Sequence, residues 1–185
     1  MNKSVTKQIK TLAALTFGIM MLMSLSSCGS DDKEDVVKKA DGFHYSVVLQ
    51  VPSSDVDQLD IVRTVVTVKN SSTGAVLEET EAEFMGDVAI ISPNQKICTL
   101  PFEGTVEVKQ TLKDGVDLTK KEQYKTGLYI GVVISSLDKN NDAVAGEETH
   151  SSRSTTCYGD DLSKMYPLTT SFKFKVDGSG NVRLS

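Results

Sequence analysis

The sequence predicts an all-β fold, an antiparallel β-sandwich, for the chain that follows residue 42. Segments in which apolar and polar residues alternate recur along this part, and Val and Thr are frequent in them. Gly, Pro, Asn and Ser separate these segments, as they do in turns between short strands. No segment shows a sustained 3.6-residue apolar period with helix caps. Short strands with regular turns of this kind are typical of β-sandwiches.

The expected strands follow one another closely along the chain. Phe43, Tyr45 and Val47 alternate with more polar residues, so one face of the first strand is committed to a core. Residues 124–137 form the longest apolar run after the N-terminal segment, which indicates a central strand covered on both sides. In order, strands are expected at residues 43–51, 61–69, 75–83, 88–92, 97–102, 105–112, 124–137, 171–177 and 182–184.

Turn residues and two short helical segments complete this prediction. A turn is expected at residues 70–74, and Gly178-Ser179-Gly180-Asn181 predicts the final hairpin. The best helical candidates are residues 54–59 and 160–165. A domain of about 143 residues buries roughly two thirds of its unfolded surface, so it needs no metal or dense disulfides to fold.

The N-terminal segment is typical of a secretory signal. Lys3, Lys7 and Lys10 precede an apolar stretch at residues 12–25, and no acidic residue occurs before Asp31. The apolar stretch is too short and wrongly flanked for a spanning helix.

The end of this segment, Leu25-Ser26-Ser27-Cys28, resembles the lipobox of bacterial lipoproteins. The resemblance implies that the Cys28 thiol receives a diacylglycerol, that residues 1–27 are removed as a signal peptide, and that acyl chains such as palmitate anchor the protein. The alternative is an ordinary secretory signal with an unrelated cysteine. Loss of three lysines with the signal changes the net charge from −5 to −8.

Residues 28–42 are expected to form a lipidated Cys and a flexible acidic tether, and residues 43–185 a single domain. The run from Ser30 to Asp35 resembles the surface-export signal of Bacteroidota lipoproteins, which implies display on the cell surface. The alternative is a solvated tether with no export role, on the periplasmic face of the outer membrane. The acidic charge excludes a nucleic-acid partner, which needs clustered Lys and Arg.

Residues 65–112 resemble transthyretin-like or carboxypeptidase-regulatory-like β-sandwiches. The likeness lies in the strand and Thr-Gly turn at residues 65–74, in Gly86 with the strand after it, and in Pro101-Phe102-Glu103-Gly104 before a further strand. The resemblance covers about a third of the domain and implies an accessory or binding module without catalytic residues. An immunoglobulin-like topology is the alternative that these turns leave open.

Cys98 and Cys157 remain after Cys28 is assigned to lipidation. An exported protein matures in an oxidising compartment, so the two thiols are a disulfide candidate. The alternative is a pair of unconnected thiols, because pairing depends on a Cα separation that the sequence does not reveal.

Oxygen ligands alternate at Asp138, Asn140 and Asp142, as they do in calcium loops. However, Ala143 stands where an EF-hand loop needs Gly, and Thr149 stands where it needs Glu. Asx-rich loops also form hairpin turns without any ion, so calcium is the weaker interpretation and no cofactor is expected.

Motifs for catalysis or phosphate binding are absent from the sequence, which has no Gly-x-Ser-x-Gly and no Gly-Lys-Ser/Thr. His44 is expected on the solvent face of the first strand. His150, which follows Glu147 and Glu148, is expected in a mobile loop. A catalytic site gathered in space without a motif stays open as an alternative, because triads need no fixed spacing.

Residues 138–164 are expected to form a long polar loop, either a binding surface or an edge-covering insertion. Arg153, Tyr158 and Tyr166 are its candidate contact residues. The expected function is that of a lipid-anchored outer-membrane or cell-surface protein, a non-enzymatic binding or accessory module with a protein or glycan partner. The alternatives are a subunit of a surface fibre or adhesin, and a hydrolase with a non-motif site.

Overall fold

The computed structural model describes residues 38–185, which form one compact unit. Residues 1–37, with the expected signal peptide, Cys28 and most of the tether, lie outside the described residues, so the predictions for them are not tested by it. Within residues 38–185, no helix reaches the length and hydropathy that a membrane crossing requires.

The segments in which apolar and polar residues alternate form two antiparallel sheets, and these pack together as the predicted all-β sandwich. The four-stranded sheet has the order β4-β1-β6-β7 and the five-stranded sheet the order β3-β2-β5-β8-β9. The strands are β1 (Gly42–Gln50), β2 (Val62–Asn70), β3 (Val76–Glu81), β4 (Val88–Ile91), β5 (Phe102–Leu112), β6 (Gln123–Leu137), β7 (Ala143–Tyr158), β8 (Leu168–Val176) and β9 (Val182–Leu184). The helices are α2 (Gln58–Ile61) and α3 (Gly159–Met165).

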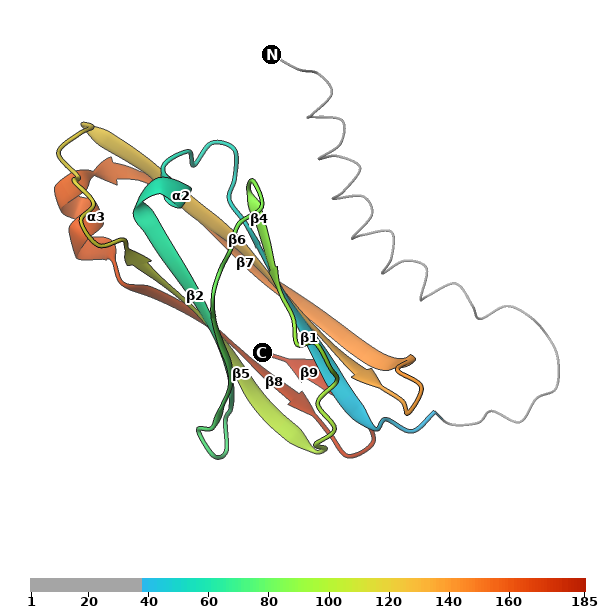
Figure 1. Cartoon of the computed structure of the whole chain (residues 1–185). Helices are drawn as coiled ribbons and strands as arrows, with labels where there is room; N and C mark the ends of the chain where they lie inside the picture. The colour runs from blue at the N-terminus through green and yellow to red at the C-terminus, as the bar shows by residue number, and fades with distance from the viewer. Residues whose placement is uncertain (1–37) are drawn as a thin grey trace, which may run out of the picture. The chain divides into compact units, whose positions relative to one another are not determined.

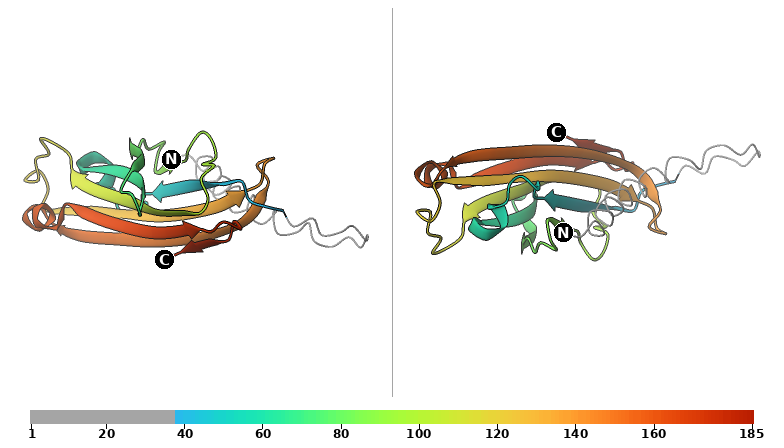
Figure 2. Two further views of the ribbon diagram at one scale, coloured as in Figure 1. Left: turned by 90° about the horizontal axis from the view of Figure 1, so that it is seen from below. Right: turned by 90° about the horizontal axis from the view of Figure 1, so that it is seen from above.

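The sandwich has two distinct ends. At the entry end, the chain enters at Lys38, and Lys38 forms an ion pair with Asp142 in the β6–β7 turn. At the helical end lie α2, α3 and the loop between β5 and β6 (Figure 1). β7 runs along one side of the domain for its length, with α3 at one of its ends (Figure 2).

The main core fills the space between the two sheets. β1 buries alternate residues, and Phe43, Tyr45 and Val47 are fully buried as their alternation predicts. Phe43 of the four-stranded sheet contacts Phe102 and Phe174 of the five-stranded sheet, with ring centroids 4.8 and 5.6 Å apart. This aromatic cluster joins the two sheets near the entry end.

Gly104 makes room for this cluster. It lies opposite Phe174 in the β5–β8 pairing, and a Cβ atom here would overlap the rings of Phe174 and Phe102. The glycine that the turn pattern singled out is therefore a packing position inside β5, because the two rings lie over its backbone.

A second, smaller cluster closes the helical end. Ile61, Val62, Tyr124, Leu162 and Tyr166 form it, and Leu162 of α3 is fully buried. Buried polar side chains lie nearby in the fold, on the segment before α2, at the first residue of α2 and near the start of β2. These are Asp55, Asp57, Gln58 and Thr64.

Three predicted elements differ in the structure. The helix expected at residues 54–59 begins only at Gln58, as α2, and turns precede it. The strand expected at residues 97–102 is reduced to one bridge, in which Ile97 exchanges backbone hydrogen bonds of 2.8 and 2.9 Å with Phe43, and Phe102 begins β5. β6 is central in its sheet, as predicted, but its outer face is only partly covered.

The prediction of a long polar loop at residues 138–164 is wrong, because most of this segment forms β7 and α3. Only the tight turn between β6 and β7 is irregular, β7 spans 16 residues, and α3 follows it. β7 is polar on both faces because it lies at the edge of its sheet, where neither face is sealed by the core. A search for alternating apolar residues therefore finds no strand here.

Candidate functional site

A groove lies between β3 and β1, on the side of the sandwich where β3 and β4 are the edge strands of the two sheets. Its volume is about 300 Å³, at the lower end of the range for ligand pockets. It is lined by Tyr45, Leu77, Glu78, Ser92, Pro93, Asn94 and Ile97. We call this cavity the β3 groove.

One hydrogen bond across the two sheets forms the floor of the β3 groove. The Tyr45 hydroxyl donates to a carboxylate oxygen of Glu78, and the Thr80 hydroxyl donates to the other Glu78 oxygen at 3.1 Å. Burial raises the pKa of Tyr45 above its ordinary value, and the hydrogen bond to Glu78 and its negative charge act in the same direction. Tyr45 therefore stays protonated and acts as a structural donor.

The segment at residues 92–97, which borders the groove, is held in place by β1 and by Asp41 just before it. The His44 Nε2 atom donates to the Pro93 carbonyl oxygen at 3.1 Å, and Ile97 pairs with Phe43. Lys96 adds an ion pair with Asp41 at 2.8 Å. His44 lies on the outer face of β1, as predicted, and its role here is to fix the rim of the groove.

Exposed apolar side chains accompany the β3 groove. Six large apolar side chains are strongly exposed among residues 38–185, and four of them lie on β3, on β4 or between the two strands. These four are Val76, Leu77, Met85 and Ile90, and Met85 is 84% exposed. We call this part of the surface the β3–β4 side. Contiguous exposed apolar patches are typical of interaction sites, and these four side chains are the candidates for such a patch.

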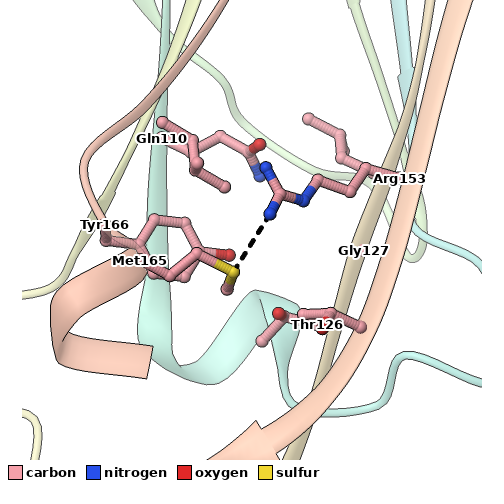
Figure 3. Close-up of a pocket in the computed structure, with 9 residues that line it drawn as sticks. Gln110, Thr126, Gly127, Arg153, Met165 and Tyr166 are labelled. Carbon is pink, nitrogen blue, oxygen red and sulfur yellow. Dashed lines mark hydrogen bonds between the residues drawn. The ribbon is translucent and has the colours of Figure 1, made fainter. Parts of the chain in front are cut away.

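The predicted contact residues of the 138–164 segment do not form one site. Arg153 and Tyr166 line a small pocket at the helical end, together with Gln110, Thr126 and Met165 (Figure 3). Tyr158 is more than half exposed and is not among the lining residues. Tyr166 is buried in the second cluster, so it supports packing and is not a free contact residue.

The pocket at the helical end is too small for a substrate. It leaves room for about one water molecule. One Arg153 nitrogen donates to the Met165 sulfur at 3.3 Å, which closes one side of the pocket (Figure 3). Burial raises the pKa of Tyr166, and the Thr126 hydrogen bond and the Arg153 charge oppose this shift. The phenol is therefore uncharged at neutral pH.

Two buried carboxylates lie on the segment before α2. Asp55 is 2% exposed and accepts a hydrogen bond of 2.7 Å from Ser154 of β7, while its other oxygen has no partner among the described residues. Gly127 of β6 leaves space for this carboxylate, because a Cβ atom at Gly127 would overlap it. Asp55 thus reaches across β6 to β7.

Asp57 fixes the same segment to the start of β6. Its side chain accepts from the Lys125 amide at 2.7 Å and from the Lys121 ammonium, and its own amide donates to the Lys125 carbonyl at 3.0 Å. Burial raises the pKa of Asp57, but the contacts with Lys121 and Lys125 outweigh it and leave the pKa below its usual value. These carboxylates act as structural supports.

Cys98 and Cys157 are free thiols in the structure, which has the alternative of two unconnected thiols and not the candidate disulfide. Cys98 lies beside Gly42 and hence near Leu137, whereas Cys157 pairs with Tyr124 at the other end of β6. At about 3.3 Å per residue, these ends are about 40 Å apart, far beyond the reach of a disulfide. Burial and the nearby Asp161 raise the pKa of the Cys157 thiol.

The residues of the weak calcium candidate form a turn. One Asp138 oxygen accepts from the backbone amides of Asn140 and Asp142, at 2.8 and 2.9 Å. Lys38 forms an ion pair with Asp142, and Lys96 donates to the Asp138 carbonyl. Two ammonium groups beside the loop oppose a cation, and no metal-ligand cluster occurs among residues 38–185.

His150 lies in β7 and not in the mobile loop expected for it. Its ring stacks on Tyr129 of β6, with ring centroids 5.8 Å apart. Glu148 and His150 share the outer face of β7 with Ser152, as alternation along a strand requires.

Comparison with known proteins finds no matching family model, no matching curated protein and no matching solved structure. The sequence does not predict the β3 groove or the β3–β4 side. Their residues come from strands far apart in the chain and from both sheets, so no local spacing reveals them. The four exposed apolar residues stand at positions 76, 77, 85 and 90 and form no continuous run in the sequence.

Proposed function

We propose that this protein is a lipid-anchored, cell-surface binding module without enzymatic activity, and that it contacts a protein partner through the β3–β4 side. The observation that carries the proposal is that Val76, Leu77, Met85 and Ile90 are exposed on β3, on β4 or between the two strands, with Leu77 lining the β3 groove. A monomeric domain gains nothing from keeping these side chains in water, whereas a partner that covers them gains their burial.

Several features support a binding role over catalysis. The groove contains one titratable pair, Tyr45 and Glu78, and Tyr45 is committed to a hydrogen bond. His44 and His150 lie on outer faces of β1 and β7 and serve packing or rim contacts. A hydrolase would require a nucleophile and a base converging on a substrate-sized cavity.

Anchoring through Cys28 can be tested by metabolic labelling with palmitate in the native host. Cys28→Ala should abolish the label and release the protein from membranes, whereas Cys98→Ala should retain both. Equal labelling of the two variants would contradict the lipid anchor. Protease treatment of intact cells should degrade the domain if it is displayed, and full protection would place it on the periplasmic face.

The partner contact can be tested with surface substitutions that leave the fold intact. The triple variant Leu77→Glu, Met85→Glu and Ile90→Glu should lose proteins that the lipidated wild type captures from surface membranes. The control variant Val56→Glu and Tyr158→Glu changes exposed apolar residues away from the β3–β4 side and should retain them. Capture that does not distinguish the two variants would reject the β3–β4 side as the contact.

A further inference from the structure

β7 leaves one edge of the four-stranded sheet unpaired along its length. It spans 16 residues, pairs with β6, and has no second neighbour among the described strands. The other edges belong to β3, β4 and β9, which span 6, 4 and 3 residues. An unpaired edge presents N–H and C=O groups to another strand.

β7 carries three charged side chains and one register shift, but two other features that commonly protect such an edge are absent from it. It contains no Pro and no Lys. Its one register shift against β6 lies at the turn, between Ser136 and Leu137, so the pairing from Ala145 to Tyr158 is regular. Small hydroxyl side chains predominate in its second half, and they leave the backbone accessible.

Two of the three charged side chains of β7, those of Glu147 and Arg153, are placed symmetrically about His150. Glu147 lies three positions before His150 and Arg153 three positions after it, so alternation puts both charges on the same face of the strand. Both residues are exposed. Neither has an ion-pair partner among residues 38–185.

We propose that two copies of this chain associate through antiparallel pairing of β7 with β7, with His150 of each copy opposite the partner's His150. In this register Glu147 lies opposite the partner's Arg153, and the two-fold symmetry forms the same pair twice. Ala143 lies opposite the partner's Cys157, so almost the whole strand is used.

Neighbouring registers lose this match. Centring on Ser151 places Glu147 opposite the partner's Thr155, and centring on Glu148 or Arg153 opposes like charges. A register that placed Glu148 opposite the partner's Arg153 fails for another reason. Glu148 lies on the outer face of β7 and Arg153 on the inner face, so the two side chains would point to opposite sides of the joined sheet. The charges and the strand length therefore select the same register.

Existing contacts of the two charged residues are compatible with this pairing. Glu147 uses its Oε2 atom to accept from the Leu184 amide at 2.6 Å, which leaves Oε1 for the partner's Arg153. Arg153 contacts the uncharged sulfur of Met165, so its positive charge is available for the partner's Glu147. The pairing joins two four-stranded sheets into one continuous sheet, and a two-fold contact of this kind closes as a dimer.

Disulfide trapping in native membranes tests the register on the full, lipidated protein. His150→Cys places two thiols opposite each other, and mild oxidation should give a dimer on a non-reducing gel. Ser152→Cys is the matched control, since it lies on the same face but opposite the partner's Glu148. Wild-type protein reports the background from Cys98 and Cys157. Equal cross-linking of the two variants, or none, would overturn the proposed register.

A charge exchange tests the ion pairs independently. In detergent, Glu147→Arg and Arg153→Glu should each weaken the dimer at least about tenfold by sedimentation velocity, because each opposes like charges twice. The double variant Glu147→Arg, Arg153→Glu should restore association. Circular dichroism verifies that all three remain folded. A double variant as weak as the single variants, or a wild type that stays monomeric, would refute the proposal.

Discussion

The two hydrophobic clusters of the sandwich are built in different ways. The main core consists of alternating residues from both sheets, with Phe43, Phe102 and Phe174 joining the sheets. The cluster at the helical end is small and has buried polar groups beside it, including Asp55 and Asp57. Strand alternation is sufficient to build the first, whereas the second depends on specific contacts between remote segments.

The largest effect is expected in the main core. Phe174→Ala should lower the free energy of unfolding by about 3–5 kcal/mol, because it removes a buried ring that contacts Phe43 and Phe102. Urea denaturation measures this loss. Phe84→Ala, at a half-buried position that packs on the edge of the same cluster, should cost less. Equal losses would mean that the aromatic cluster is not the centre of the core.

A smaller but more specific effect is expected at Gly127. Gly127→Ala should destabilise by about 1–3 kcal/mol, because the added methyl group overlaps the Asp55 carboxylate and approaches the Arg153 carbonyl oxygen. Gly131→Ala is the control on the same face of β6, where the nearest atom is a Tyr129 ring carbon at 3.3 Å. Thermal unfolding of both variants distinguishes them, and equal stability would show that Asp55 does not require the glycine.

Asp57 should make the helical end sensitive to acid. Its folded pKa lies below the usual carboxyl value, so its contribution is present above about pH 4 and is lost as the pH falls through the folded value. Asp57→Asn should cost about 1 kcal/mol at pH 7, since the Lys121 partner is half exposed and solvent screens it. The stability difference from wild type should shrink below pH 4. A difference that does not change with pH would contradict this role.

The smallest effect is expected at Thr64. Its hydroxyl is buried without a hydrogen-bond partner among residues 38–185. Thr64→Val removes that hydroxyl at nearly constant volume and should be neutral or stabilise by up to about 1 kcal/mol. A loss of stability would show that an ordered water satisfies the hydroxyl. Chemical denaturation at pH 7 provides the measurement.

The main core could be predicted from the sequence because its physical signal is local. Alternation at Phe43, Tyr45 and Val47 identifies β1, and the turn residues locate most other strands within a few positions. β7 could not be predicted in this way, because an edge strand with two polar faces has no apolar alternation. Its Val, Thr and Tyr residues favour a strand, but that preference is weak beside the many Ser, Asn and Asp residues of the surrounding segment.

Less of the candidate site than of the fold could be predicted from the sequence. Arg153 and Tyr166 do line one pocket, but Tyr158 points elsewhere and the pocket is too small for a ligand. The β3 groove requires Tyr45 and Glu78 from different sheets, and the two residues are brought together by the sandwich itself. Cys98 and Cys157 show the converse, since a plausible pair in the sequence lies at opposite ends of β6.

The position at which the chain enters the domain determines how a β7 dimer would lie on a bilayer. Lys38 is beside the β6–β7 turn, so antiparallel pairing places the two entry points at opposite ends of the paired strands, about 50 Å apart for strands of this length. Residues 28–37 can extend to roughly 35 Å at most. With both copies anchored through Cys28, the paired strands would run along the membrane between two attachment points, and each copy would present its β3–β4 side at an outer flank of the joined sheet.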